Sequence, residues 1–172
     1  AFPISDWTKF YRFYSYTTTD MKLKEYNFWT AFDITTLSYV QEKYLGNWSI
    51  YIRWFDISPD WKYLYDINYT TDLVRQWTFW TNWNVSTLTL TDTFAVGAYV
   101  TVPHSVAILD DWSSLIVWDR NTWLALQIDL STPFDLTTAS YIRQKSLADT
   151  NSYEFSSDWT KIFVWYDVWW VL

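Results

Sequence analysis

The sequence predicts an all-β repeat protein, and three observations support that fold class. First, within the 172 residues a short marker returns at intervals of 51 residues. Second, runs rich in Thr, Tyr, Trp, Phe, Val and Ile alternate with turn residues, a pattern typical of half-buried strands. Third, no segment carries a sustained apolar stripe with the 3.6-residue period of a helix. Repeats of this length predict units of one kind stacked side by side.

Two features mark the repeat. One is a turn in which tryptophan follows aspartate, and it occurs four times: Asp6-Trp7, Asp60-Trp61, Asp111-Trp112 and Asp158-Trp159. The other is an Asp or Asn that follows an aromatic residue and precedes an aliphatic residue and two hydroxyl residues. Its three copies are Asp33, Asn84 and Asp135, each 51 residues from the next.

Each complete repeat is expected to hold four short strands. In the first repeat these are 2–5, 9–16, 21–28 and 37–44. In the second they are 54–58, 62–69, 73–79 and 88–94. In the third they are 105–109, 113–119, 124–130 and 139–146. The last repeat stops after 153–156 and 161–166. Alternation is plain in Met21-Lys22-Leu23-Lys24, where both apolar side chains fall on one face of a strand.

Four short antiparallel strands in each repeat of 40 to 50 residues are typical of a β-propeller blade. We therefore expect blades at about 2–53, 54–104 and 105–152, with a partial blade at 153–172. A closed propeller usually has four to eight blades, so we expect the chain to be part of a longer propeller. Open blade edges would also allow the chain to associate with itself.

Two phrases carry a family resemblance. They are Phe-Asp-Ile-Ser-Pro-Asp-Trp-Lys-Tyr-Leu-Tyr at 55–65 and Asp-Leu-Ser-Thr-Pro-Phe-Asp-Leu-Thr-Thr-Ala-Ser-Tyr at 129–141. They resemble the blades of bacterial and phage propellers of the YVTN type, and more widely WD-repeat-like blades. The resemblance covers nearly the whole chain and implies fold rather than function. In that family glycine usually follows the turn aspartate, where this chain has tryptophan.

The missing glycines suggest a hypothesis about the gene. The chain has 2 Gly and 15 Trp, and their sum of 17 is about 10% of its residues. Glycine alone averages about 7% of the residues in proteins. The combined share of Gly and Trp is therefore ordinary, and only its division between the two residue types is unusual. Some bacteria and phages read UGA as glycine, and translation under the code that reads UGA as tryptophan would produce this split. Further tryptophans stand where the family has glycine or a small residue: Trp29, Trp54, Trp80, Trp118 and Trp165.

The alternative is a chain that truly presents tryptophans at its loop tips, for example to stack on glycans. UGG codons at positions 7, 61, 112 and 159 would exclude misreading. A positive φ at these positions would mark backbone suited to glycine, because a residue with a Cβ loses about 1–2 kcal/mol there.

Composition excludes several function classes. The net charge of −7 argues against nucleic-acid binding, which needs a basic surface. No apolar run is long enough to span a membrane. Cysteine is absent and His104 is the single histidine, so a zinc site of several Cys or His ligands is excluded. We expect no cofactor and no metal site, and Asp110-Asp111 and Asp149-Thr150-Asn151 are expected to be solvated loops.

Catalytic groups are also scarce. No Gly-x-Ser-x-Gly motif surrounds Ser105, and the turn aspartates recur with the repeat, as structural residues do. We expect a non-enzymatic recognition or scaffold module that binds a protein or a glycan, exposed on a cell or phage surface or secreted. The alternative is a propeller enzyme of lactonase or quinoprotein-like type, which carboxylates around a channel metal would favour. A third alternative is a chain with no selected function in this form.

Overall fold

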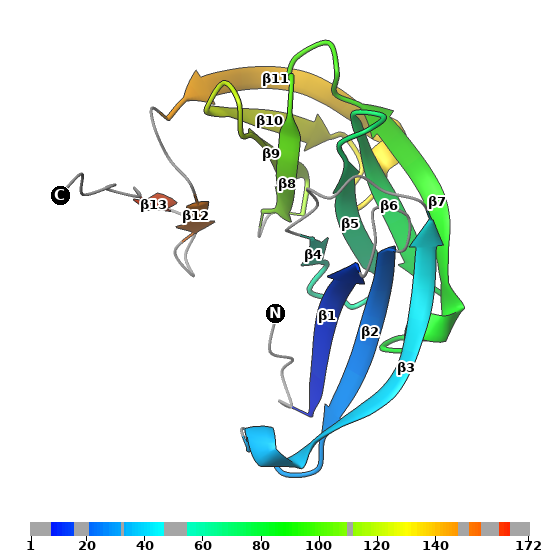
Figure 1. Ribbon diagram of the computed structural model, residues 1–172. Coiled ribbons are helices and arrows are strands. Elements are labelled where there is room, and N and C mark those ends of the chain that lie inside the picture. The colour runs from blue at the N-terminus through cyan, green and yellow to red at the C-terminus, as the bar shows by residue number, and fades with distance from the viewer. Residues whose placement is uncertain are drawn as a thin grey trace, which may run out of the picture.

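The computed structural model describes residues 8–15, 21–31, 33–46, 55–109, 112–147, 152–155 and 162–165. Within them the chain is all-β, and its sheets follow one another around an arc with β4 and β8 nearest the centre (Figure 1). Every strand pairs antiparallel with its sequence neighbour in the same sheet. The predicted fold class, propeller blades of four antiparallel strands, is confirmed.

The strands lie close to their predicted positions. Blade 1 contains β1 (Lys9–Ser15), β2 (Met21–Phe28) and β3 (Leu37–Gly46). Blade 2 contains β4 (Asp56–Ile57), β5 (Tyr63–Asn68), β6 (Leu73–Phe79) and β7 (Leu88–Ala95). Blade 3 contains β8 (Pro103–Ile108), β9 (Ser114–Asp119), β10 (Leu124–Leu130) and β11 (Ala139–Ser146). A further pair is formed by β12 (Ser152–Phe155) and β13 (Ile162–Trp165). The predicted strand at 2–5 lies outside the described residues.

A short 3-10 turn, which the sequence pattern did not predict, joins the last two strands of each of the three blades. These turns are η1 (Ile34–Thr36), η2 (Val85–Thr87) and η3 (Leu136–Thr138). The residue before each turn is the repeat marker Asp33, Asn84 or Asp135. Its side chain accepts a hydrogen bond from the amide two residues later, which is the local bond that Asp and Asn offer at turns.

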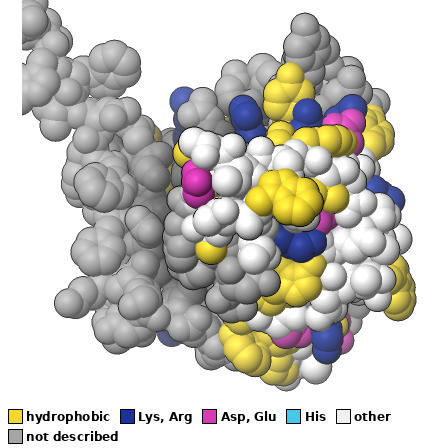
Figure 2. Space-filling view, turned by 90° about the horizontal axis from the view of Figure 1, so that it is seen from below, with side chains coloured by type: hydrophobic (Ala, Val, Ile, Leu, Met, Phe, Trp, Pro, Cys, Tyr) yellow, Lys and Arg dark blue, Asp and Glu magenta, His cyan; other side chains and the backbone are white. Residues whose placement is uncertain are grey.

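The apolar faces of the blades form two buried clusters. One includes Tyr11, Met21 and Leu23 of blade 1 together with Leu64 and Trp77 of blade 2. The other includes residues of blades 2 and 3, such as Ile67 and Val74 with Val117 and Leu126. Other hydrophobic side chains remain at the surface, where Figure 2 shows them as separate patches among polar groups. The cores therefore lie between neighbouring blades.

Four tryptophans have a left-handed backbone. Trp61 has φ 59°, Trp112 has 57°, Trp83 has 70° and Trp123 has 57°. Trp61 and Trp112 are the two described copies of the Asp-Trp turn, and Trp7 and Trp159 lie outside the described residues. Both copies of this turn that the structure describes therefore have the positive φ that would mark backbone suited to glycine.

The counterparts of the other two tryptophans, 51 residues away, help to interpret them. Trp123 corresponds to Asp72, with φ 51°, a residue type that enters this region more readily than most. Trp83 corresponds to Phe134, with φ 63°, so an aromatic residue occupies that position in both blades. Position 83 is therefore not specific for glycine.

Other tryptophans do not fit the prediction of glycine-like sites. Trp29 and Trp80 are described but have no positive φ. Trp118 stands where a small residue was expected, yet it lies within β9 and is 2% exposed. The side chain of Trp118 is part of the core rather than an addition to a tight turn.

Backbone strain at Trp112 predicts an unusual order of variant stability. At ordinary positions alanine is more stable than glycine, but a Cβ is unfavourable at positive φ. We expect Trp112→Gly to be more stable than Trp112→Ala by about 1 kcal/mol, since both variants lose the same ring. Urea unfolding would measure the difference. The same pair at Trp80 is the control, and there alanine should equal or exceed glycine; the same order at both sites would contradict the prediction.

Candidate recognition surface

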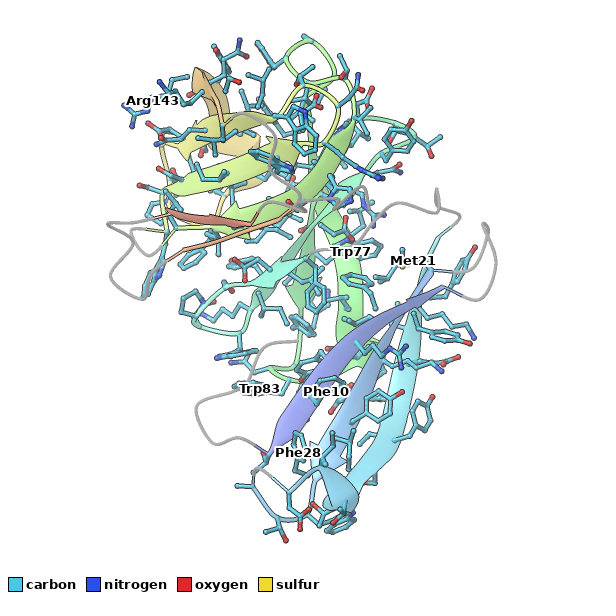
Figure 3. All side chains as sticks on the ribbon, turned by 60° about the vertical axis from the view of Figure 1, so that its left-hand side comes forward. Phe10, Met21, Phe28, Trp77, Trp83 and Arg143 are labelled. Atoms are coloured by element: carbon cyan, nitrogen blue, oxygen red, sulfur yellow. The ribbon has the colours of Figure 1, made fainter. Side chains whose placement is uncertain are left out.

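Blades 1 and 2 meet at a joint built from main-chain groups of blade 2. The Trp83 carbonyl accepts hydrogen bonds from Tyr11 Oη at 2.9 Å and Lys9 Nζ at 3.1 Å. The Val85 amide donates to Glu25 Oε2 at 3.2 Å, and the Val85 side chain is fully buried. Figure 3 shows Trp83 beside blade 1, near the strand that carries Phe10. The left-handed backbone at Trp83 presents its carbonyl to the neighbouring blade.

The same joint recurs between blades 2 and 3. Tyr65 Oη donates to the Phe134 carbonyl at 2.9 Å, and the Leu136 amide donates to Gln76 Oε1 at 2.9 Å. Leu136 is 1% exposed. A β-bulge follows Gln76, and an equivalent bulge follows Glu25. The extra residue of each bulge lies in the last strand of the blade, Thr91 in β7 and Val40 in β3, so Gln76 and Glu25 occupy equivalent places beside the bulge.

The Asp-Trp turn is held by local bonds at its described residues. Asp60 Oδ1 accepts from Ser58 Oγ at 2.6 Å and from the Lys62 amide at 3.2 Å. These are turn contacts of the kind that Asp commonly makes. The other aspartates of this turn (Asp6, Asp111 and Asp158) lie outside the described residues.

An aromatic pair recurs in blades 2 and 3 at positions 51 residues apart. Trp61 stacks on Trp83 with 3.8 Å between ring centroids, and Trp112 lies 5.1 Å from Phe134. A tryptophan presented at a loop tip, the alternative to misreading, would be exposed, but Trp61 is half-buried and stacked on Trp83. The rings therefore cover the turns at one end of each blade.

The largest exposed rings lie at the same end of the blades, directly after β2 and β6. Trp29 is 82% exposed and Trp80 is 72% exposed. Trp80 Nε1 donates to Thr89 Oγ1 at 2.7 Å, which orients the ring. Blade 3 has Ser131 at the corresponding position. We call Trp29 and Trp80 the tryptophan pair; exposed apolar groups of this size are typical of binding surfaces.

A buried ion pair lies between blades 1 and 2. Arg75 Nε donates to Asp66 Oδ1 at 2.8 Å, and Trp77 Nε1 donates to Asp66 Oδ2 at 2.9 Å. Arg75 also donates to the Leu45 carbonyl of blade 1 at 3.3 Å. Burial raises the pKa of Asp66 and lowers that of Arg75, while their attraction opposes both shifts. Each charge is thus satisfied, and this set is structural.

A second carboxyl group, that of the half-buried Asp56, connects the two inner strands. Asp56 Oδ2 accepts from the Ile108 amide of β8 at 2.9 Å, and Oδ1 accepts from the Ile57 amide at 2.8 Å. Burial raises the pKa of Asp56 to about 7, although both amide bonds act to lower it. Asp56 therefore changes its protonation state near neutral pH.

The described residues contain no group of three or more His, Asp or Glu side chains arranged to hold a metal ion. His104 and Ser105 are buried within β8, the inner strand of blade 3. No helix in the described part of the chain is long and apolar enough to cross a membrane.

Comparisons with known proteins support the fold. No family model matches the sequence, and no curated protein matches it. A protein from Lactobacillus plantarum has a TM-score of 0.61 and 13% identity, over 94% of this chain and 46% of that one. A "putative 6-phosphogluconolactonase" from Bacteroides uniformis has a TM-score of 0.58 and 8% identity, over 88% and 48%.

Hydrazine synthase of Kuenenia stuttgartiensis has a TM-score of 0.53 and 15% identity, over 84% of this chain and 38% of that one. At these identities the likeness shows the fold alone. This chain spans less than half the length of each of the three structures. The chain is a set of β-propeller blades.

The raised pKa of Asp56 predicts how stability depends on pH. In the folded state the acid stays protonated to about pH 7, whereas in the unfolded state it ionises near pH 3.8. Its contribution is therefore complete below about pH 4 and is lost as pH rises through 7, by up to about 4 kcal/mol. Urea unfolding from pH 4 to 8 should show this loss, and Asp56→Asn should flatten it. An unchanged pH slope in the variant would contradict the assignment.

Proposed function

We propose that the chain is a non-enzymatic recognition module that binds a protein segment through the tryptophan pair, Trp29 and Trp80. The single observation that carries this proposal is the large exposure of two equivalent rings on neighbouring blades. Rings held in place lose little conformational entropy on binding, and tryptophan is enriched among residues that dominate interface energy.

The position of the pair supports a binding role over a packing role. Trp80 remains exposed although the joint beside it is filled by the buried Val85. Its ring is oriented by Thr89 rather than by a neighbouring blade. The tryptophan pair is thus surface that blade packing leaves uncovered, as a ligand-binding site requires.

A protein ligand fits this surface better than a glycan. Other exposed apolar side chains lie on β3 in blade 1, among them Tyr39 and Val40. Aliphatic and aromatic groups together favour an apolar protein segment, whereas a sugar requires polar groups that converge beside the ring. The enzyme alternative would need polar side chains that converge in the channel. The described inner strands provide Asp56, His104 and Ser105 there.

The proposal is tested by selecting peptides from a displayed library on the immobilised chain and measuring their affinity in solution. The double variant Trp29→Ser/Trp80→Ser carries the residue that blade 3 has at this position, Ser131. We expect it to bind the selected peptides at least tenfold more weakly, as loss of interface anchors does.

Leu90→Ser, an exposed substitution on β7, is the matched control and should leave affinity unchanged. Equal affinity of the double variant would overturn the proposal. Binding to an oligosaccharide array that requires the tryptophan pair would replace the protein ligand with a glycan. Hydrolysis of a sugar lactone by the chain would favour the enzyme.

We further propose that Trp61, Trp112 and Trp123 are encoded as glycine in the source organism by UGA codons. Support comes from the backbone, because these three residues have φ between 57° and 59° in turns where glycine has no strain. Trp29, Trp80 and Trp118 lack this support. The proposal for peptide binding therefore rests on tryptophans whose backbone does not favour glycine.

The gene gives a direct test of this assignment. We expect UGA at codons 61, 112 and 123, and mass spectrometry of the native protein should show glycine there. UGG at these codons would overturn the assignment. UGA at codons 29 and 80 as well would remove the tryptophan pair from the native protein, and the peptide-binding proposal with it.

A further inference from the structure

Two exposed tyrosines from separate segments of the chain stack on each other with parallel rings. Tyr99 lies on the connection between β7 and β8, and Tyr141 lies on β11, the outer strand of blade 3. Their ring centroids are 4.4 Å apart and their ring planes differ by 4°. Tyr99 is 39% exposed and Tyr141 is 38% exposed, so solvent reaches both rings. Figure 1 shows the connection from β7 to β8 beside β11.

The exposure of Tyr141 is a property of its place in the blade. Leu90 holds the same place in blade 2, since each residue lies opposite the first residue after the bulge. Leu90 is 46% exposed although blade 3 follows blade 2. A neighbouring blade therefore leaves this place on the outer strand uncovered.

The connection that carries Tyr99 is held at both ends. Val96, at its start, is fully buried in the core between blades 2 and 3. The Tyr99 amide donates to the Val96 carbonyl at 2.8 Å. Near the end of the connection, the Val102 amide donates to Asp119 Oδ2 at 3.1 Å, which ties it to β9. The fold itself therefore places the Tyr99 ring against Tyr141.

A second tyrosine pair shows that ring orientation sets this stack apart. Tyr26 and Tyr39 of blade 1 meet edge to face, with centroids 5.9 Å apart and planes at 74°. Tyr39 is 54% exposed, so the two pairs differ in geometry rather than in access to solvent. A parallel stack brings the carbons ortho to the two hydroxyl groups face to face, whereas an edge-to-face pair does not. Proximity and orientation of this kind favour bond formation between two groups.

We propose that Tyr99 and Tyr141 are a modification site, at which a haem peroxidase with hydrogen peroxide joins the two rings as dityrosine. Each phenol gives one electron and one proton to the oxidant and becomes a tyrosyl radical. The two radicals form one carbon–carbon bond between ortho carbons, and each ortho hydrogen then moves as a proton to the oxygen of its own ring. In total, two tyrosines and one hydrogen peroxide give one dityrosine and two molecules of water.

The link joins the connection between blades 2 and 3 to the outer strand of blade 3. The chain has no cysteine, so it has no disulfide that could serve this purpose. A covalent link between distant residues restricts the unfolded chain, as a disulfide does. The oxidised chain should therefore resist unfolding more than the parent.

Peptide mapping after oxidation tests the site directly. Tyr99 is the single tyrosine of the tryptic peptide 76–120, and Tyr141 is the single tyrosine of peptide 121–143. After treatment with peroxidase and hydrogen peroxide, the monomer fraction should contain these two peptides joined, with two hydrogens fewer than their sum. We expect roughly tenfold more of this product than of a Tyr26–Tyr39 link within peptide 25–43, because only the first pair is stacked in parallel. Oxidation in urea, which removes the stack, should abolish the difference.

Phenylalanine variants supply the controls, because they keep a ring that can stack but remove the phenol. Tyr99→Phe and Tyr141→Phe should each abolish the joined peptide, whereas Tyr39→Phe should leave its amount unchanged. The oxidised parent should unfold at a higher urea concentration than Tyr99→Phe treated in the same way. Absence of the joined peptide from the parent, or an equal amount of the Tyr26–Tyr39 link, would overturn the proposal.

Discussion

The hydrogen bonds between a tyrosine hydroxyl and the carbonyl of a left-handed residue in the next blade fix how the blades stack. Tyr11 reaches Trp83 and Tyr65 reaches Phe134, each at 2.9 Å. These bonds place the following 3-10 turn so that Val85 or Leu136 enters the space between blades. A buried carbonyl or amide without a hydrogen-bond partner destabilises the fold by about 1–3 kcal/mol. The joint therefore both packs the blades together and supplies partners for these main-chain groups.

The joint also explains the unusual backbone at its centre. A residue with positive φ is unfavourable unless its surroundings hold it there. At Trp83 and Phe134 the surroundings are the tyrosine, the N-cap and a stacked or tilted aromatic partner. At Trp112 and Trp123 no bond to a neighbouring blade has the same role among the contacts described above. The backbone strain at Trp112 and Trp123 is therefore stronger evidence for codons that specify glycine than the strain at Trp83.

The strands could be predicted from the sequence because their signals are local. The ranges 73–79, 124–130 and 139–146 were predicted at the bounds that the structure has. The repeat markers were found as well, but their role as N-caps depends on a side-chain bond that a pattern of residue types does not reveal. The joints could not be predicted, since Tyr11 and Trp83 are 72 residues apart and their bond ends on a main-chain atom. The sequence singled out Trp29 and Trp80 only by their positions in the repeat. Their exposure could not be predicted, because it depends on which blade lies beside each side chain.

The use of main-chain groups at the joint has a consequence for how such arrays change. Every residue type has the main-chain carbonyl that accepts these bonds, and every type except proline has the main-chain amide that donates them. A duplicated unit that keeps the apolar residues between the blades therefore needs only the tyrosine, a Glu or Gln before the bulge and the capping residue to form the polar bonds of the joint. The exposed side chains can diverge, so the array can lengthen while the residues on its exposed turns evolve separately.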